Sequence, residues 1–250
     1  MDQAIHPGAA VGKNTSVGFY TVIGEGAVVG DDCIIGNHVV IHGKSRIGNG
    51  VRIDDHAVIG KLPLAAARSK TTGGSRDLPP AVIGDGALIG TGAIIYAGAS
   101  IGARALIADT ASVREDCMIG ELTIVGRNAM IENKVTGGSR CKIQADVYIC
   151  AYSVIGDNCF IAPCVTTSND NYAGRWKERT KYYKGVTVEN GGRIAVNATI
   201  LPGRTIGSDG MAAAGAVVTR DIPARTIAAG NPARKLPDVP NNQLLDNQEE

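Results

Sequence analysis

Five residues whose side chains can bind or react recur at intervals of 18 in the middle of the sequence. They are Tyr96, Arg114, Glu132, Cys150 and Ser168, called the reactive column below. Two other series with the same spacing are almost entirely Gly or Ala; they are Gly84, Gly102, Gly120, Gly138 and Gly156, and Gly90, Ala108, Gly126, Gln144 and Ala162. An exposed face that simply carries polar residues would explain the column, but not why the other two series avoid such residues. We therefore predict that the reactive column marks a functional site.

Two carboxylates are candidates for proton transfer. Glu132 belongs to the reactive column, and the hexad that holds Asp109 starts 24 residues before the hexad of Glu132. If 18 residues complete one coil, 24 residues are one coil plus one face, so we expect the two side chains to approach one corner. Paired carboxylates can hold a reacting group and accept its protons. Two structural roles stay open: Asp109 as a turn cap, and Glu132 as an ion partner for Arg114.

A repeat of six residues must position these side chains. Every sixth residue from Ile5 to Ile59, Ile83 to Ile161 and Val188 to Val218 belongs to one series, and 28 of its 30 positions are Ile or Val. Six residues form one short strand and a turn, and three strands form a coil of 18 residues that stacks on the next at about 4.8 Å. The sequence therefore predicts an all-β parallel β-helix of about ten coils.

Small residues occupy a second inward position, four residues after the aliphatic one. Four of the six cysteines lie there, as small buried hydrophobes; they are Cys33, Cys117, Cys141 and Cys159. No two cysteines are spaced as C-x-x-C, so we expect no metal site.

Three segments interrupt the period. We predict loops at 61–80 and 167–187, the second of which holds the single Trp, Trp176. Long loops inside a regular solenoid are often functional. The β-helix is expected to span 1–222, and 223–250 to form a C-terminal extension.

The overall charge favours neither nucleic acid nor a membrane as partner, because 25 Lys and Arg face 24 Asp and Glu. The first residues have neither the basic nor the apolar part of a signal peptide. No stretch approaches the roughly 20 apolar residues of a membrane span. We therefore expect a cytoplasmic protein.

The sequence resembles the hexapeptide-repeat acyltransferases, above all the N-acyltransferases of nucleotide-linked amino-deoxysugars. The stretches that carry the resemblance are IYAGASIG (95–102), IADTASVRED (107–116), MIENKVTGGSRCKIQADVYICAYSVIGDN (130–158), APCVTTSNDNYAGR (162–175) and IPARTIAAGNPARKL (222–236). Enzymes acting on dTDP-linked 3-amino- or 4-amino-dideoxyhexoses are the nearest type, with UDP-amino-sugar enzymes as neighbours. The resemblance implies a left-handed coil and a homotrimer with active sites between subunits.

The resemblance also implies ligand contacts. Coenzyme A, with acetyl as the default acyl group, would lie between neighbouring β-helices, against the backbone near Ala195 and Gly215. Arg234 and Lys235 would meet its phosphates. The sugar nucleotide, dTDP before UDP, would lie beside the reactive column; further contacts are expected from Asn133, Asn169, Asp170 and Tyr172.

No histidine follows His56, so we expect direct attack by the sugar amine without a catalytic histidine. Glu132 and Asp109 would hold the amine and take its protons, while a thiolate leaves. If the 61–80 loop replaces no strand, His6 and His42 extend the reactive column. A covalent role for Cys150 is disfavoured, because no base adjoins it. An O-acyltransferase and a non-catalytic β-helix scaffold are the alternative functions.

Overall fold

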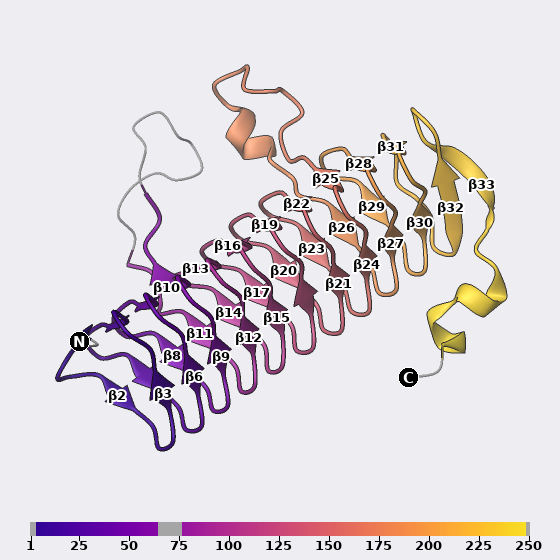
Figure 1. Ribbon diagram of the computed structural model, residues 1–250. Helices are drawn as coiled ribbons and strands as arrows, with labels where there is room; N and C mark the ends of the chain where they lie inside the picture. Colours follow the sequence, from indigo (N-terminus) through magenta and orange to yellow (C-terminus); the bar gives the residue numbers. More distant parts are fainter. Residues whose placement is uncertain (1–3, 65–76, 249–250) are drawn as a thin grey trace.

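The computed structural model describes residues 4–64 and 77–248, which form one long parallel β-helix (Figure 1). Its short strands stack into three sheets, here A, B and C, and within the described residues these contain 11, 10 and 12 strands. The predicted fold class is confirmed, with slightly more coils than the expected ten. The left-handed sense of winding stays a prediction.

The chain passes through sheets A, B and C in turn. Sheet A contains β1 (Ala4–Ile5), β4 (Val22–Ile23), β7 (Val40–Ile41), β10 (Val58–Lys61), β13 (Ile94–Tyr96), β16 (Ser112–Val113), β19 (Met130–Ile131), β22 (Tyr148–Ile149), β25 (Thr166–Thr167), β28 (Thr199–Ile200) and β31 (Val217–Val218). Sheet B contains β2 (Ala10–Val11), β5 (Val28–Val29), β8 (Arg46–Ile47), β11 (Val82–Ile83), β14 (Ser100–Ile101), β17 (Met118–Ile119), β20 (Thr136–Gly137), β23 (Val154–Ile155), β26 (Thr187–Val188) and β29 (Thr205–Ile206). Sheet C contains β3 (Ser16–Val17), β6 (Ile34–Ile35), β9 (Arg52–Ile53), β12 (Leu88–Ile89), β15 (Leu106–Ile107), β18 (Ile124–Val125), β21 (Lys142–Ile143), β24 (Phe160–Ile161), β27 (Arg193–Ile194), β30 (Met211–Ala212), β32 (Thr226–Ala229) and β33 (Arg234–Asp238). We call the turns that follow sheets A, B and C the first, second and third corners.

The second residue of almost every strand points into the narrow core. From Ile23 onward these Ile and Val side chains are nearly fully buried, as are the small residues four positions later. The four cysteines predicted to be inward are at most 2% exposed. Each hexad buries one aliphatic side chain, and this burial stabilises the solenoid. Each such side chain removed from water contributes about 1.5–3 kcal/mol.

Both predicted loops leave the helix at the first corner. β10 pairs with β7 and with β13, so the first loop replaces no strand; its residues 65–76 lie outside the described part. His6 and His42 therefore extend the reactive column, as expected. The second loop runs from β25 to β26 and contains the 3-10 helix η1 (Arg179–Tyr182).

The C-terminal end closes sheet C. β32 pairs with β30 in parallel, so the β-helix continues past the boundary expected at 222. β33 then pairs antiparallel with β32, and η2 (Asn241–Gln243) and η3 (Leu245–Asn247) follow. Among the described residues, no helix is long and apolar enough to cross a membrane.

Candidate functional site

The reactive column is a physical stack at the first corner. Its residues Tyr96, Arg114 and Glu132 end or follow β13, β16 and β19, which are consecutive neighbours in sheet A. The guanidinium carbon of Arg114 lies 5.0 Å from the centroid of the Tyr96 ring. Nη1 of Arg114 donates to Oε2 of Glu132 at 3.4 Å. The ion-pair role considered for Glu132 is thus confirmed, and Glu132 sits beside a cation.

A β-bulge adds a second cation to this stack. Ile59 pairs with Ile95 but Lys61 pairs with Tyr96, so Gly60 is the extra residue in β10. Gly60 has a φ of +79°, a conformation that favours glycine and is typical of bulges. The bulge brings Nζ of Lys61 to 5.1 Å from the centroid of the Tyr96 ring. Tyr96 therefore has one cation from the coil before it and one from the coil after it.

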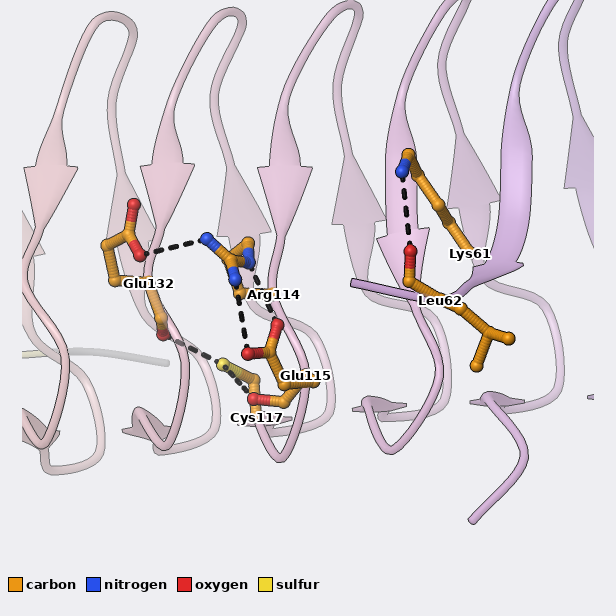
Figure 2. Close-up of polar contacts among 6 residues, drawn as sticks. All are labelled: Lys61, Leu62, Arg114, Glu115, Cys117 and Glu132. Atoms are coloured by element: carbon orange, nitrogen blue, oxygen red, sulfur yellow. Dashed lines mark hydrogen bonds and ion pairs between the residues drawn. The ribbon is translucent and has the colours of Figure 1, made fainter. Parts of the chain in front are cut away.

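Glu115 holds Arg114 in place, and the sequence reasoning missed it. The two carboxylate oxygens of Glu115 accept hydrogen bonds from Nε and Nη2 of Arg114 at 2.8 and 3.1 Å (Figure 2). Glu115 is only 1% exposed, and a buried carboxylate needs such a partner. The sequence did contain a signal for Glu115. The residues at the equivalent position in the coils before and after it are Ala97 and Asn133, so a charged residue there is unusual.

Asp109 does not share a corner with Glu132. Asp109 follows β15 of sheet C, whereas Glu132 follows β19 of sheet A. The prediction that these carboxylates meet within one chain is therefore wrong, because a step of one coil plus one face leads to a different corner. Oδ1 of Asp109 accepts the backbone N–H of Thr91, one coil below, at 3.0 Å. This is the turn-capping role.

Cys150 and Asn133 lie behind the surface of the stack. Cys150 is 1% exposed, and its Sγ lies 3.3 Å from Oγ of Ser153. The Cys150 thiol therefore presents almost no surface for the predicted contact with substrate in this chain. Asn133 is 2% exposed, and its Oδ1 has no hydrogen-bond partner within the described chain. Ser168 is partly exposed at the far end of the column.

Tyr148 lies on β22 beside the stack and is half-buried. Its burial and then the negative charge of Glu132 raise the pKa of its phenol to about 12. The hydroxyl therefore keeps its proton at neutral pH and can donate a hydrogen bond.

His42 enters the same column two coils before Tyr96, which puts it about 10 Å away along the stack. Burial and the nearby charge of Lys61 lower the pKa of its imidazole, so the ring is neutral at pH 7. His42 also lines a cavity of about 260 Å³ together with Gly60 and Pro79. His42 thus extends the column as expected, and direct attack without a catalytic histidine stays a prediction.

The second loop is braced by one of its predicted ligand-binding residues. Oδ1 of Asp170 accepts the N–H of Tyr172 at 2.8 Å, and Oδ2 accepts Nε of Arg179 at 3.2 Å. Desolvation opposes ionisation, but these donors outweigh it and lower the pKa of Asp170. Tyr172 packs against Trp176, with ring centroids 5.0 Å apart. The backbone carbonyl of Asn169 accepts the N–H of Lys184 at 3.2 Å where the loop closes.

The residues predicted to bind coenzyme A lie at the C-terminal end of the coil. Ala195 and Gly215 share the third corner in successive coils, where the N–H of Gly215 donates to Val196 at 2.9 Å. Arg234 and Lys235 start β33 and line a cavity of about 160 Å³. Lys235 forms an exposed ion pair with Asp238. These positions leave both cations accessible to an anionic ligand.

The structure shows no cluster of three or more His, Cys, Asp or Glu residues that could hold a metal ion within 4–64 and 77–248. The groups of the described first corner that can bind charges or transfer protons include Lys61, Arg114, Glu132, the Tyr148 hydroxyl and, two coils away, a neutral His42. Such a set can bind anions, hold an amine or hydroxyl and accept a proton.

Comparisons with known proteins find similarity to bacterial transferases in parts of the chain. The family model described as bacterial transferase hexapeptide (six repeats) matches residues 8–43. Galactoside O-acetyltransferase of Escherichia coli K12 is 35% identical over 128 residues, which is 46% of this chain and 63% of that protein. The dTDP-3-amino-3,6-dideoxy-alpha-D-galactopyranose 3-N-acetyltransferase of Aneurinibacillus thermoaerophilus is 51% identical over 47 residues, 19% of this chain and 24% of the relative. The chain thus spans less than two thirds of these relatives.

A solved structure agrees with the fold. The UDP-N-acetylglucosamine O-acyltransferase of Moraxella catarrhalis superposes with a TM-score of 0.55 at 16% identity, covering 94% of this chain and 72% of that one. At this identity the likeness supports the parallel β-helix and nothing beyond it.

Proposed function

We propose that this chain is an acyltransferase of the hexapeptide-repeat type, because parts of it are similar to the bacterial transferase hexapeptide model and to two acetyltransferases. Its donor is acetyl-CoA and its acceptor is the amino group of a nucleotide-linked amino-deoxysugar, with dTDP favoured over UDP. The 3-N-acetyltransferase relative supports an amine as acceptor.

The stack at the first corner is the observation that carries this proposal. Lys61 and Arg114 flank Tyr96, and two fixed cations suit the diphosphate of a sugar nucleotide. Glu132 follows in the next coil with a side chain 27% exposed, so its carboxylate is accessible to an ammonium group. One edge of the coil therefore offers partners for both charged ends of such a substrate.

Glu132 acts on the amine in the proposed reaction. It accepts one proton from the ammonium group, directly or through water, which frees the nitrogen lone pair. The nitrogen attacks the thioester carbonyl, the C–N bond forms and the C–S bond breaks. The second amine proton ends on the departing thiolate, so the products are the amide, free coenzyme A and one proton released to solvent. Positioning supplies much of the rate, because a thiolate is a good leaving group.

Coenzyme A is placed at the C-terminal end in this proposal. The third-corner backbone at Ala195 and Gly215 would lie along the pantetheine chain, and Arg234 and Lys235 would meet the phosphates. A homotrimer would bring this end of one chain beside the first corner of the next. Asn169 and Tyr172 remain proposed contacts of the sugar nucleotide, whereas the buried Asn133 presents almost no surface to it.

A screen of dTDP- and UDP-linked amino sugars with acetyl-CoA, followed by free-thiol release, tests the function. We expect turnover with an amino-deoxysugar nucleotide and a loss of kcat/KM of about 100-fold in Glu132→Gln. Asp109→Asn is the matched control, because it keeps the hydrogen-bond acceptor for Thr91 and lies at another corner. Normal kcat/KM in Glu132→Gln would contradict the role of Glu132. Failure of the protein to bind acetyl-CoA in calorimetry would favour a non-catalytic scaffold.

Transfer to a hydroxyl is the second candidate function. A hydroxyl needs a stronger base than an amine, and the neutral His42 in the extended column supplies one. The similarity to a galactoside O-acetyltransferase points the same way. Thiol release with galactosides that is lost in His42→Asn would establish this alternative over the amine acceptor.

A further inference from the structure

The cavity of about 260 Å³ at the first corner lies where the first loop leaves the coil. The turn 42–44 after β7 lines it, and so do Leu62, Leu78 and Pro79 at the described ends of the loop. Leu62 is 60% exposed, so part of this apolar lining faces solvent. A concave apolar surface with a few polar groups is typical of a site for a small molecule.

Lys61 lies at the rim of this cavity. Gly60 and Leu62, its neighbours in the chain, both line the cavity. Burial and then the charge of Lys61 lower the pKa of the His42 imidazole, so the ammonium group is close to the His42 side of the cavity. In the other direction, Nζ of Lys61 lies 5.1 Å from the centroid of the Tyr96 ring. Lys61 therefore connects the cavity to the reactive column.

The groups along the first corner follow one another in a fixed order. Figure 2 shows Glu132, Arg114 and Lys61 in succession along the coil, and the cavity adjoins Lys61 on the side of β7. β19, β16, β13 and β10 are consecutive in sheet A, so about 14 Å separate the coil of Glu132 from that of Lys61. A sugar nucleotide has its parts in a matching order: amino sugar, diphosphate, pentose and base. With the amine at Glu132 and the diphosphate between Arg114 and Lys61, the base reaches the cavity.

The chemistry of the cavity suits a nucleobase. Leu62, Leu78 and Pro79 offer apolar surface to the face of a planar ring, and the imidazole of His42 can form a hydrogen bond with its polar edge. A volume of about 260 Å³ is small for a whole nucleotide and suits a single ring system. The phosphates would stay outside the cavity, where Lys61 complements their charge.

We propose that this cavity binds the nucleobase of the sugar nucleotide, with Leu62, Leu78 and Pro79 packed against the ring. The inference rests on the proposed function, because it uses the diphosphate site at Lys61 and Arg114. It gives the described ends of the first loop a role in substrate recognition. The acceptor is then held at both of its ends, by the base in the cavity and by the amine at Glu132.

Calorimetry of the full-length chain with dTDP and, separately, with inorganic pyrophosphate tests the proposal. The two ligands share the charged group, but only dTDP carries a base. Because the base buries apolar surface in the cavity, we expect dTDP to bind about tenfold more tightly than pyrophosphate. Equal affinity for the two ligands, or no binding of dTDP at millimolar concentration, would overturn the proposal.

A double variant separates the cavity from the charged groups. Leu62→Ala combined with Leu78→Ala removes apolar surface from the lining and should lower the affinity for dTDP about tenfold, with the affinity for pyrophosphate unchanged. Leu122→Ala is the matched control, because Leu122 is an exposed leucine at the second corner; both affinities should equal those of the wild type. Circular dichroism should show an intact coil in both variants. Wild-type affinity for dTDP in the double variant would refute the base site.

Turnover distinguishes the base site from the proposed reaction. With an amino-sugar nucleotide that gives thiol release, the double variant should raise KM and leave kcat unchanged, because the base takes no part in the chemical step. Turnover with an unchanged KM in the double variant would refute the base site and leave the acyltransferase function standing. Without turnover, a preference for dTDP over pyrophosphate that the double variant loses would support the base site and count against acyl transfer to an amino sugar.

Discussion

The first and second corners are formed by the same six-residue repeat, yet they connect successive coils through different interactions. At the second corner Gly120 lies so near the next coil that a Cβ would come within 2.5 Å of the nitrogen of Ser139. Asp157 then caps the corner, accepting the N–H of Ser139 at 2.7 Å. At the first corner the same two positions hold Arg114 and Glu115, which bond to each other.

This difference teaches where a solenoid can carry chemistry. Where the backbones of successive coils pack closely, only small or turn-forming residues such as Gly, Ala, Asn and Asp fit. These residues stabilise the corner and leave no side chain free for a ligand. The first corner uses side-chain pairs and stacked groups instead, and both loops leave from it. We therefore propose that the second corner mainly stabilises the coil and that the first corner carries the function. Each prediction below tests one of these two roles.

The largest expected effect is on stability at the second corner. Gly120→Ala puts a methyl group against the carbonyl of Gly138 and should lower the free energy of unfolding by about 3 kcal/mol. Gly137→Ala, one strand further on, meets its nearest atom, Cδ1 of Ile119, at 3.4 Å and should change it by less than about 1 kcal/mol. Urea unfolding of both variants provides the measurement. Equal losses would mean that the corner does not depend on close backbone approach.

A smaller loss, with a larger effect on activity, is expected at the first corner. Glu115→Gln removes the buried charge that holds Arg114, and we expect a loss of about 2 kcal/mol in stability. It should also reduce thiol release at least tenfold, because Arg114 then pairs mainly with Glu132. Glu121→Gln, exposed at the second corner, should leave both values unchanged. Full activity in Glu115→Gln would show that the position of Arg114 is irrelevant to turnover.

Asp109 gives an intermediate case at the third corner. Asp109→Ala removes the acceptor for the N–H of Thr91 and should cost about 1 kcal/mol of stability. Its kcat/KM should match that of the wild type, because the residue is remote from the stack. A loss of activity without a loss of stability would return Asp109 to the list of catalytic candidates, acting across a subunit boundary.

The sequence reasoning succeeded where a period decides the structure. A residue every 18 positions must stack on its neighbours, so the reactive column and the inward cysteines followed from spacing alone. It failed where a local irregularity determines the position of a side chain. Lys61 reaches Tyr96 only through the bulge at Gly60, and a bulge inserts a residue that no period reveals.

Side-chain direction was the other source of error. Cys150 follows an aliphatic residue as Arg114 does, but its thiol is small enough to be buried beside Ser153. Glu115 follows Arg114 by one residue, and its burial depends on a hydrogen-bonded partner that spacing does not specify. Corner position gives the face of the coil, whereas the size and charge of the side chain determine whether it turns inward.

The smallest expected effect concerns the titration of His42. Its folded-state pKa lies below the ordinary value of 6.5 because of burial and Lys61, so between these two values the unfolded chain binds more protons. The free energy of unfolding should therefore fall as the pH is lowered through this range, and His42→Asn should reduce that dependence. NMR titration should place the midpoint of His42 below 6.5. The ring of His38 is exposed and stacks on His56 at the third corner. His38→Asn is the matched control and should leave the His42 midpoint unchanged. A His42 midpoint at or above 6.5 would show that burial and Lys61 do not lower the pKa of the imidazole in the folded chain.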